Sequence, residues 1–298
     1  VALQSDRIDV DNGLACVVNG YGLQIFDVAD PAHPRFESAY SPGGLAYDVQ
    51  VAGATAYYAG EAGLQALDLS DPSSPSVITS LSPFPAHAVH LKGERLSSIV
   101  HTAEPSRVFR LYGVPQPNAF TLIGECEVDG GEAVHASGEL AGVANASYPR
   151  GFEIVDISDP ASPTVLGSFP STGPVVGIQL SGDYAYVSDL YEGLLIYDIV
   201  NPAAPELLTQ IQRWGYTSVV AVRGNRVFGA GANDVLVLSV DDPTSPGLLG
   251  WYELPFGYDA ERLDVVDRRM YVTTANGGIW ILEYVGEPSR ATLWRRYR

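Results

Sequence analysis

Short apolar runs separated by turn residues recur along the whole chain. Residues 56–59 (Ala-Tyr-Tyr-Ala) and 194–197 (Leu-Leu-Ile-Tyr) are typical, and glycine, proline, asparagine or aspartate follows such runs at close intervals. Runs of this length between turn residues indicate β-strands. We identify no segment with three turns of amphipathic helical periodicity. The pattern therefore predicts an all-β chain of many short strands.

The turn residues themselves repeat. The motif Asp-Pro-x-x-Pro begins at Asp30, Asp71, Asp159 and Asp242, with an asparagine variant at Asn201. Its first prolines are 41, 88, 42 and 41 residues apart, and the 88-residue interval contains a degenerate copy at 113–117. A final strand of the same type lies at 278–284. The chain therefore contains seven repeats of about 42 residues.

Each repeat predicts four strands. The strand before the turn lies at residues 22–28, 63–69, 106–112, 151–157, 193–199, 234–240 and 278–284. An alternating strand comes earlier in the repeat, as at 49–53, a second short strand follows it, and a fourth follows the turn. Four short strands repeated seven times are typical of a propeller, whose stacked blades bury both faces of each sheet.

We therefore predict one domain over 1–298, a seven-bladed β-propeller with four antiparallel strands per blade. The predicted blades are 6–40, 41–82, 83–128, 129–170, 171–212, 213–254 and 255–298. The outer strand of the last blade could come from Val1 to Gln4 or from Ala291 to Trp294. We prefer the C-terminal segment, because every repeat then runs in the same phase.

The amino-acid sequence of the repeat resembles that of a known family. Residues 151–160 read Gly-Phe-Glu-Ile-Val-Asp-Ile-Ser-Asp-Pro, which is similar to the consensus of the LVIVD-repeat propellers of bacteria and archaea, and the resemblance covers nearly the whole chain. It implies a secreted, periplasmic or cell-surface module. The resemblance identifies no catalytic residue in this chain.

Aspartates also recur just before the turns, at Asp27, Asp68, Asp156 and Asp198. At this position a carboxylate can accept the backbone N–H groups of the following bend. We therefore interpret these four residues as structural.

The charge of the chain limits its partners. A formal net charge of -18 produces a field that repels phosphate backbones and anionic lipid headgroups, so we expect no nucleic-acid partner. No apolar run is long enough to span a membrane, and we expect no membrane insertion. Cys16 and Cys126 fall in non-adjacent repeats, so we expect no disulfide between them.

Aligning the repeats reveals a polar column near the end of the first strand. It reads Asp9, Gln50, His90, His135, Gln179, Ala221 and Asp264, and the column three residues earlier reads Asp6, Tyr47, His87, Glu132, Val176, Ser218 and Glu261. Residues three apart on a strand point to opposite faces. The expected pairings therefore run between blades, His90 with His135 and His87 with Glu132.

Two hypotheses follow for these side chains. A cluster of His87, His90, Glu132, His135, Tyr148 and Arg150 could form a lyase or hydrolase site, with a histidine or tyrosine moving the proton and Arg150 neutralising negative charge. His90 and His135 could also bind a divalent metal as a cofactor. The alternative is that the polar column only lines a hydrated channel.

The loops on one face predict a funnel rich in aromatic and charged residues. Its candidate ligand-binding residues are Tyr21, Tyr47, Asp48, His101, Asp189, Tyr191, Trp214, Tyr216, Tyr258 and Arg262. Such a lining suits a small polar molecule, a glycan or a protein partner. The third repeat deviates most, through either function or repeat decay. We favour an exported binding or scaffolding propeller, and the alternative is an enzyme acting on a small polar or carbohydrate-like substrate.

Overall fold

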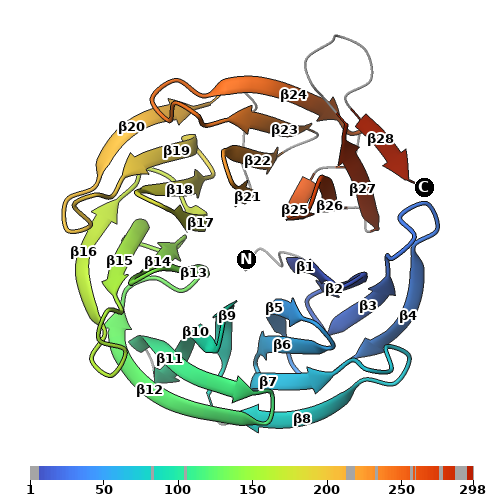
Figure 1. Ribbon diagram of the computed structural model, residues 1–298. Helices are drawn as coiled ribbons and strands as arrows, with labels where there is room; N and C mark the ends of the chain where they lie inside the picture. Colours follow the sequence, from blue (N-terminus) through green and yellow to red (C-terminus); the bar gives the residue numbers. More distant parts are fainter. Residues whose placement is uncertain are drawn as a thin grey trace.

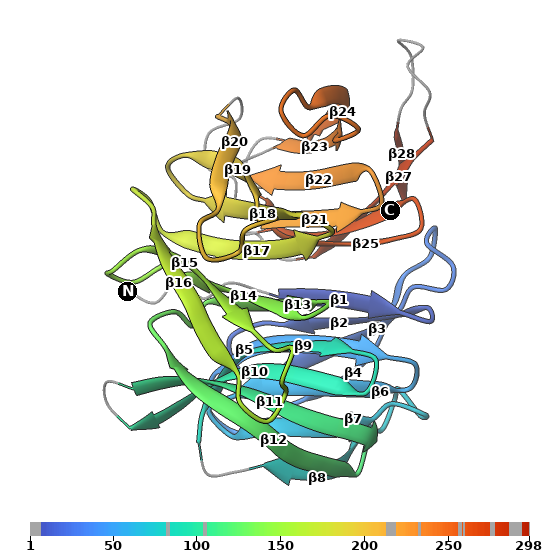
Figure 2. The same ribbon diagram turned by 60° about the vertical axis from the view of Figure 1, so that its left-hand side comes forward.

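The seven repeats build a ring of sheets. The computed structural model describes residues 7–81, 84–103, 106–212, 219–231, 234–255, 258, 260–274, 278–285 and 294–297. These residues form seven four-stranded sheets around one axis, seen end-on in Figure 1 and obliquely in Figure 2. The predicted all-β, seven-bladed β-propeller with four antiparallel strands per blade is confirmed. No described segment forms a helix long and apolar enough to cross a membrane.

Each blade uses four strands that are consecutive in the sequence. Blade one consists of β1 (Arg7–Asp11), β2 (Leu14–Val18), β3 (Leu23–Asp27) and β4 (Arg35–Tyr40), and blade two of β5 (Ala46–Ala52), β6 (Thr55–Gly60), β7 (Gly63–Asp68) and β8 (Ser76–Leu81). Blade three consists of β9 (Ala86–Lys92), β10 (Arg95–Ala103), β11 (Ser106–Gln116) and β12 (Ala119–Val128), and blade four of β13 (Ala133–Ser137), β14 (Leu140–Asn145), β15 (Gly151–Asp156) and β16 (Thr164–Pro170).

The remaining three blades repeat this order. Blade five consists of β17 (Val175–Ser181), β18 (Tyr184–Asp189), β19 (Gly193–Asp198) and β20 (Glu206–Ile211), and blade six of β21 (Val219–Arg223), β22 (Arg226–Gly231), β23 (Asp234–Ser239) and β24 (Gly247–Glu253). Blade seven consists of β25 (Ala260–Val266), β26 (Arg269–Thr274), β27 (Ile279–Tyr284) and β28 (Trp294–Tyr297).

The hydrophobic core lies between the blades. Every residue of β6 is buried, because neighbouring sheets cover both faces of a middle strand, whereas the outer strand β8 is mostly half-buried or exposed. One core cluster combines Ile99 and Phe109 of blade three with Val143 and Val155 of blade four. The stability of the ring therefore depends on contacts between adjacent blades.

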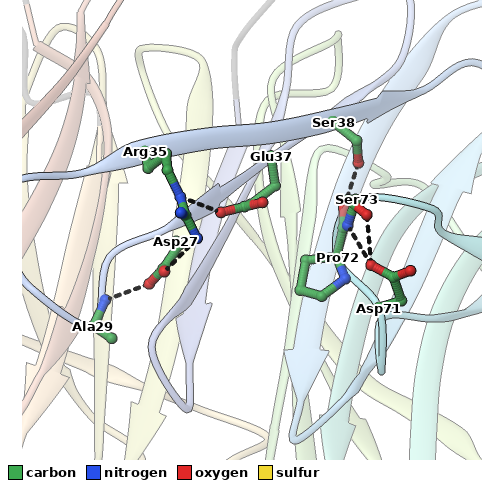
Figure 3. A network of polar contacts seen from close by, with 8 residues as sticks. All are labelled: Asp27, Ala29, Arg35, Glu37, Ser38, Asp71, Pro72 and Ser73. Atoms are coloured by element: carbon green, nitrogen blue, oxygen red, sulfur yellow. Dashed lines mark hydrogen bonds and ion pairs between the residues drawn. The ribbon is translucent and has the colours of Figure 1, made fainter.

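The repeated turns are held by the aspartates that precede them. The carboxylate of Asp27 accepts the N–H of Ala29 at 3.0 Å (Figure 3), and Asp68, Asp156 and Asp198 accept the N–H two residues further on at 2.8 Å. The structural interpretation of these four residues is confirmed.

Figure 3 also shows how one turn contacts the next blade. The guanidinium of Arg35 lies 3.3 Å from the Asp27 carboxylate and 2.7 Å from that of Glu37. Ser38, on the outer strand β4, donates a hydrogen bond of 2.5 Å to the carbonyl oxygen of Pro72 in the turn of blade two. Outer strands and turns therefore add polar contacts to the apolar layers.

No described blade combines strands from both ends of the chain. β28 (Trp294–Tyr297) pairs antiparallel with β27, so the C-terminal segment supplies the last outer strand, as expected, and the described strand includes Trp294 of the expected range. Residues 1–4 and 291–293 lie outside the described residues. Blades one and seven are joined by side-chain packing that includes Ile8 and Tyr271. Cys16 and Cys126 are both free, which confirms that they form no disulfide.

Candidate functional site

The polar column of the first strands forms a ring of hydrogen bonds between blades. Each side chain accepts the N–H of the residue that follows the column position in the next blade. The bonds run from Val51 to Asp9 (2.6 Å), Leu91 to Gln50, Ala136 to His90 (3.0 Å), Leu180 to His135 (3.2 Å), Val222 to Gln179 (2.7 Å) and Val10 to Asp264 (2.9 Å). Six of the seven junctions are linked in this way.

The seventh junction, between blades six and seven, is held by a different set of polar contacts. Ala221 has no side-chain acceptor, and Arg223 of the same strand spans the gap. Its Nη2 lies 3.0 Å from Asp264 Oδ1, and its Nε donates to the carbonyl oxygen of Val265 at 2.9 Å. Asp264 Oδ1 also accepts the N–H of Val265 at 2.7 Å. An ion pair therefore replaces the missing side-chain acceptor.

His90 and His135 pair as predicted, with ring centroids 4.2 Å apart. The Nδ1 atom of each ring accepts a backbone N–H, so it carries no proton. Burial, followed by the charges of Lys92 and Arg223, lowers the pKa of His90 to about 4. Burial and then His90 hold the pKa of His135 well below its usual value. Both imidazoles are neutral at neutral pH.

The structure brings the other candidate catalytic residues to different places. The His87 ring stacks between Tyr47 (centroids 4.1 Å apart) and His101 (3.9 Å), and burial and then His101 lower its pKa to about 4. The backbone oxygen of Glu132 accepts a hydrogen bond from Arg7. The pairing of His87 with Glu132 and a catalytic role for either stay predictions.

The residues that the structure describes contain no group of three or more histidine, cysteine, aspartate or glutamate residues that could hold a metal ion. Structural metal sites in proteins commonly use four ligands. A divalent metal on His90 and His135 stays a prediction.

A cavity of about 900 Å³ opens between blades three and four, and we call it the rim cavity. Blade three and the segment before β9 contribute Phe84, Pro85, His101, Thr102, Arg107, Glu127 and Val128, and the following connection and blade four contribute Asp129, Ser147, Tyr148, Pro149, Glu153 and Val165. The rim cavity therefore joins two residues of the predicted site, His101 and Tyr148, to the deviating third repeat.

Arg107 and Glu153 organise the wall of the rim cavity. The Nε of Arg107 donates to His101 Nε2 at 3.2 Å, and its Nη1 donates to the carbonyl oxygen of Asp129 at 2.9 Å. The buried carboxylate of Glu153 accepts the N–H groups of Asp129 (2.8 Å) and Gly130 (3.0 Å). Burial raises the pKa of Glu153. The connection between the two blades is therefore fixed from both sides.

The accessible groups of the rim cavity are of mixed character. Tyr148 is 94% exposed, and Glu127 and Asp129 are also exposed. Arg150 lies over the ring of Tyr191, 5.7 Å from its centroid, and lines an adjoining cavity of about 220 Å³. This arrangement presents an aromatic face beside hydrogen-bond donors and acceptors.

Several predicted ligand residues support the fold. Asp189 is buried, and its carboxylate accepts the N–H groups of Gly173, Tyr191 and Glu192. Tyr258 packs on the edge of Trp280, with centroids 5.4 Å apart, whereas Tyr21 is 69% exposed. Trp214 and Tyr216 lie outside the described residues. Ligand roles for these residues stay predictions.

Sequence reasoning did not select Glu127, Asp129 or Glu153. A signal was present for Glu153, because a carboxylate stands there in the otherwise apolar strand preceding a turn. Blade two has Gln65 at the corresponding position, where it accepts a hydrogen bond from Tyr40 at 2.9 Å. Nothing in the sequence distinguished the exposed acidic residues Glu127 and Asp129 in the same way.

The sequence model of the LVIVD repeat matches residues 4–41, 43–82, 132–170, 172–212 and 214–253. The chain belongs to the LVIVD-repeat family. The matches leave out the third blade and the seventh blade. The rim cavity thus lies where a typical LVIVD repeat, blade four, meets one that departs from the family pattern.

Solved structures share the fold of this LVIVD-repeat chain. A functionally unknown protein from Desulfotomaculum acetoxidans has a TM-score of 0.68 at 13% identity, covering 87% of this chain and 91% of that one. A protein from Lactobacillus plantarum has a TM-score of 0.67 at 13% identity, with coverages of 84% and 85%. The computationally designed Ika8 protein has a TM-score of 0.64 at 9% identity, with coverages of 93% and 96%. These likenesses show the fold alone. No curated protein matches the sequence.

Proposed function

We propose that this chain is a binding propeller that takes a small polar or carbohydrate-like ligand in the rim cavity. The observation that carries the proposal is the position of a cavity of about 900 Å³ beside the repeat that departs from the family pattern. Ligand pockets in proteins commonly have volumes of about 300–1,000 Å³. A departure from an otherwise consistent array is where function is expected.

The chemistry of the lining supports a hydroxyl-rich ligand. The exposed ring of Tyr148 offers an apolar face beside a polar hydroxyl. Glu127 and Asp129 offer acceptors for ligand hydroxyl groups, and Arg107 offers a charged donor group. His101 accepts from Arg107. The lining can therefore hydrogen-bond a polyol while an aromatic ring covers its apolar face.

The enzyme hypothesis receives less support. A general base works best when its pKa lies near the operating pH, whereas the pKa values of His87 and His90 are lowered to about 4. The Nδ1 atoms of His90 and His135 are also occupied by backbone N–H groups. Catalysis and an exported location stay predictions from the sequence.

Tyr148→Ala is expected to weaken binding of a neutral oligosaccharide about tenfold. Loss of an aromatic contact of about 1 kcal/mol, together with the apolar area it covers, corresponds to roughly that change in Kd. The measurement is saturation-transfer NMR of a panel of neutral di- and trisaccharides, followed by calorimetric titration of the strongest binder. Because Tyr148 is almost fully exposed, the substitution is expected to leave the free energy of unfolding unchanged.

Tyr21→Ala is the matched control, because Tyr21 was a candidate ligand residue of the predicted funnel but does not line the rim cavity. Tyr21 is also an exposed tyrosine in the loop between strands two and three, but it belongs to blade one. It is expected to bind like the wild type. An equal loss in both variants, or no binding by any member of the panel, would contradict the proposed site.

A further inference from the structure

A second layer of side chains lies two residues before the polar column of the inner strands. It reads Arg7, Asp48, Ala88, Ala133, Gly177, Val219 and Arg262 from blade one to blade seven. The charged members come from the adjacent blades seven, one and two, whereas the other four blades have small or aliphatic residues. Six of the seven members, all except Ala88, line a cavity of about 170 Å³ at the axis, which we call the channel cavity.

Two guanidinium groups therefore enter the channel cavity from the adjacent blades one and seven. The Arg7 side chain is 15% exposed, and Arg262 is buried with 6% exposed. Burial and then the charge of Arg7 lower the pKa of Arg262 to about 10, although Glu132, Glu261 and Asp48 act in the opposite direction. Arg262 is therefore charged at neutral pH.

Among the residues that the structure describes, one hydrogen-bond donor of Arg7 has no acceptor. Its Nη2 donates across the axis to the carbonyl oxygen of Glu132 in the connection to blade four. Its Nε is buried and has no hydrogen-bond acceptor there. A buried donor without an acceptor is uncommon and costly, more so when the group is charged.

Asp48 does not supply the missing acceptor. Its Oδ1 lies 3.9 Å from the Arg7 Nε, which is beyond hydrogen-bond distance. Its two oxygens accept the N–H groups of Val49 and Val89, each at 2.9 Å. The carboxylate is therefore held by the backbone of two blades and only partly offsets the charge of the arginines.

We propose that the channel cavity binds one small oxyanion between Arg7 and Arg262. A guanidinium presents parallel N–H donors that match the oxygens of carboxylate or phosphate. The channel cavity has room for roughly five water volumes, which suits an ion of a few heavy atoms. The short side chains of Ala133, Gly177 and Val219 leave that space open on the opposite wall. This site is separate from the rim cavity.

The test compares acetate and phosphate with chloride at equal ionic strength. Calorimetric titration of the full chain is expected to show one saturable site for acetate or for phosphate, and the better of the two identifies a planar or a tetrahedral ligand. The Nε–H resonance of Arg7 is expected to shift on saturation. Equal effects of all three salts, with no saturation, would overturn the proposal.

Arg7→Lys is expected to raise the Kd of the oxyanion at least tenfold, because lysine keeps the charge but lacks the two parallel donors. Arg35→Lys is the matched control, since that side chain lies on the outer strand and is 70% exposed. It is expected to bind like the wild type. Binding that is unchanged in Arg7→Lys would overturn the proposal.

Gly177→Leu tests the site without changing either arginine. A Cβ at Gly177 would contact only the Ser188 side chain, at 3.5 Å or more, so the backbone accepts a side chain there. The leucine is expected to fill the channel cavity and abolish saturable binding while the thermal transition stays cooperative. A folded Gly177→Leu that binds as tightly as the wild type would overturn the proposal, even if Arg7→Lys failed to fold.

Discussion

Lowering the pH from 7 to 4 is expected to destabilise the wild type by at least about 3 kcal/mol more than the His90→Gln, His135→Gln double variant. The pKa of His90 falls from the ordinary value near 6.5 to about 4 in the folded ring, and that of His135 also lies well below its ordinary value. A shift of one unit corresponds to about 1.4 kcal/mol. His90 alone accounts for about 3 kcal/mol, and His135 adds to it in the same direction.

The sign follows from proton binding. Between pH 6.5 and pH 4 the unfolded chain binds protons at these histidines and the folded ring does not, so acid favours unfolding. The stabilisation is complete above pH 6.5 and is lost as the pH falls toward the folded pKa. Asp9, Asp48, Asp264 and Glu153 have raised pKa values and act in the opposite direction. They are present in both proteins, so their effect largely cancels in the comparison.

Glutamine is a suitable replacement because the ring already uses it. Gln50 and Gln179 occupy the same repeat position in blades two and five and accept the same inter-blade N–H. The measurement is the free energy of unfolding from denaturant titrations at pH 7, 5.5 and 4. His33→Gln, at a side chain that is 83% exposed, is the control and is expected to behave like the wild type. A double variant with the wild-type dependence on pH would contradict this account of the histidines.

The fold could be predicted because its determinants are local and repeated. The Asp-Pro-x-x-Pro turn, the aspartate before it and the apolar run that precedes both depend on neighbours within a few residues. Seven copies at a constant spacing then specify the number of blades. The polar column was visible for the same reason, since one position of one strand recurs in every repeat.

The role of that column could not be predicted in the same way. Whether His90 binds a metal, moves a proton or accepts a backbone N–H depends on how far each inner strand is offset from the next. The structure places the side chain opposite the N–H of Ala136. This offset is a property of blade packing and leaves no mark in the sequence of a single repeat.

The rim cavity was harder still to predict. It depends on blade three, where β10, β11 and β12 have nine, eleven and ten residues, whereas β6, β7 and β8 of blade two have six each. The third repeat was recognised as deviating, but the cavity that it lines together with Tyr148 and Glu153 joins residues far apart in the sequence. Only the assembled ring brings them together.

Asp264→Ala is expected to lower the free energy of unfolding by about 3 kcal/mol. Its carboxylate accepts the N–H of Val10 across the junction of blades seven and one, accepts the N–H of Val265 and pairs with Arg223. Each buried N–H left without an acceptor costs about 1–3 kcal/mol. The two N–H groups together give a range of about 2–6 kcal/mol. Asp264 also raises the pKa of Asp9, and relief of that repulsion keeps the expected loss in the lower half of that range.

Gln179→Ala is the matched control, because it removes a single hydrogen bond at a junction between two interior blades. It is expected to cost about 1 kcal/mol. Hydrogen exchange distinguishes the two variants further. Blades four and five are consecutive in the chain, whereas blades one and seven are not, so in Asp264→Ala the amides of β1 and β25 are expected to exchange faster than those of β13 and β17. Equal destabilisation by the two variants, or uniform exchange around the ring, would show that this junction is no more dependent on its polar contacts than the others.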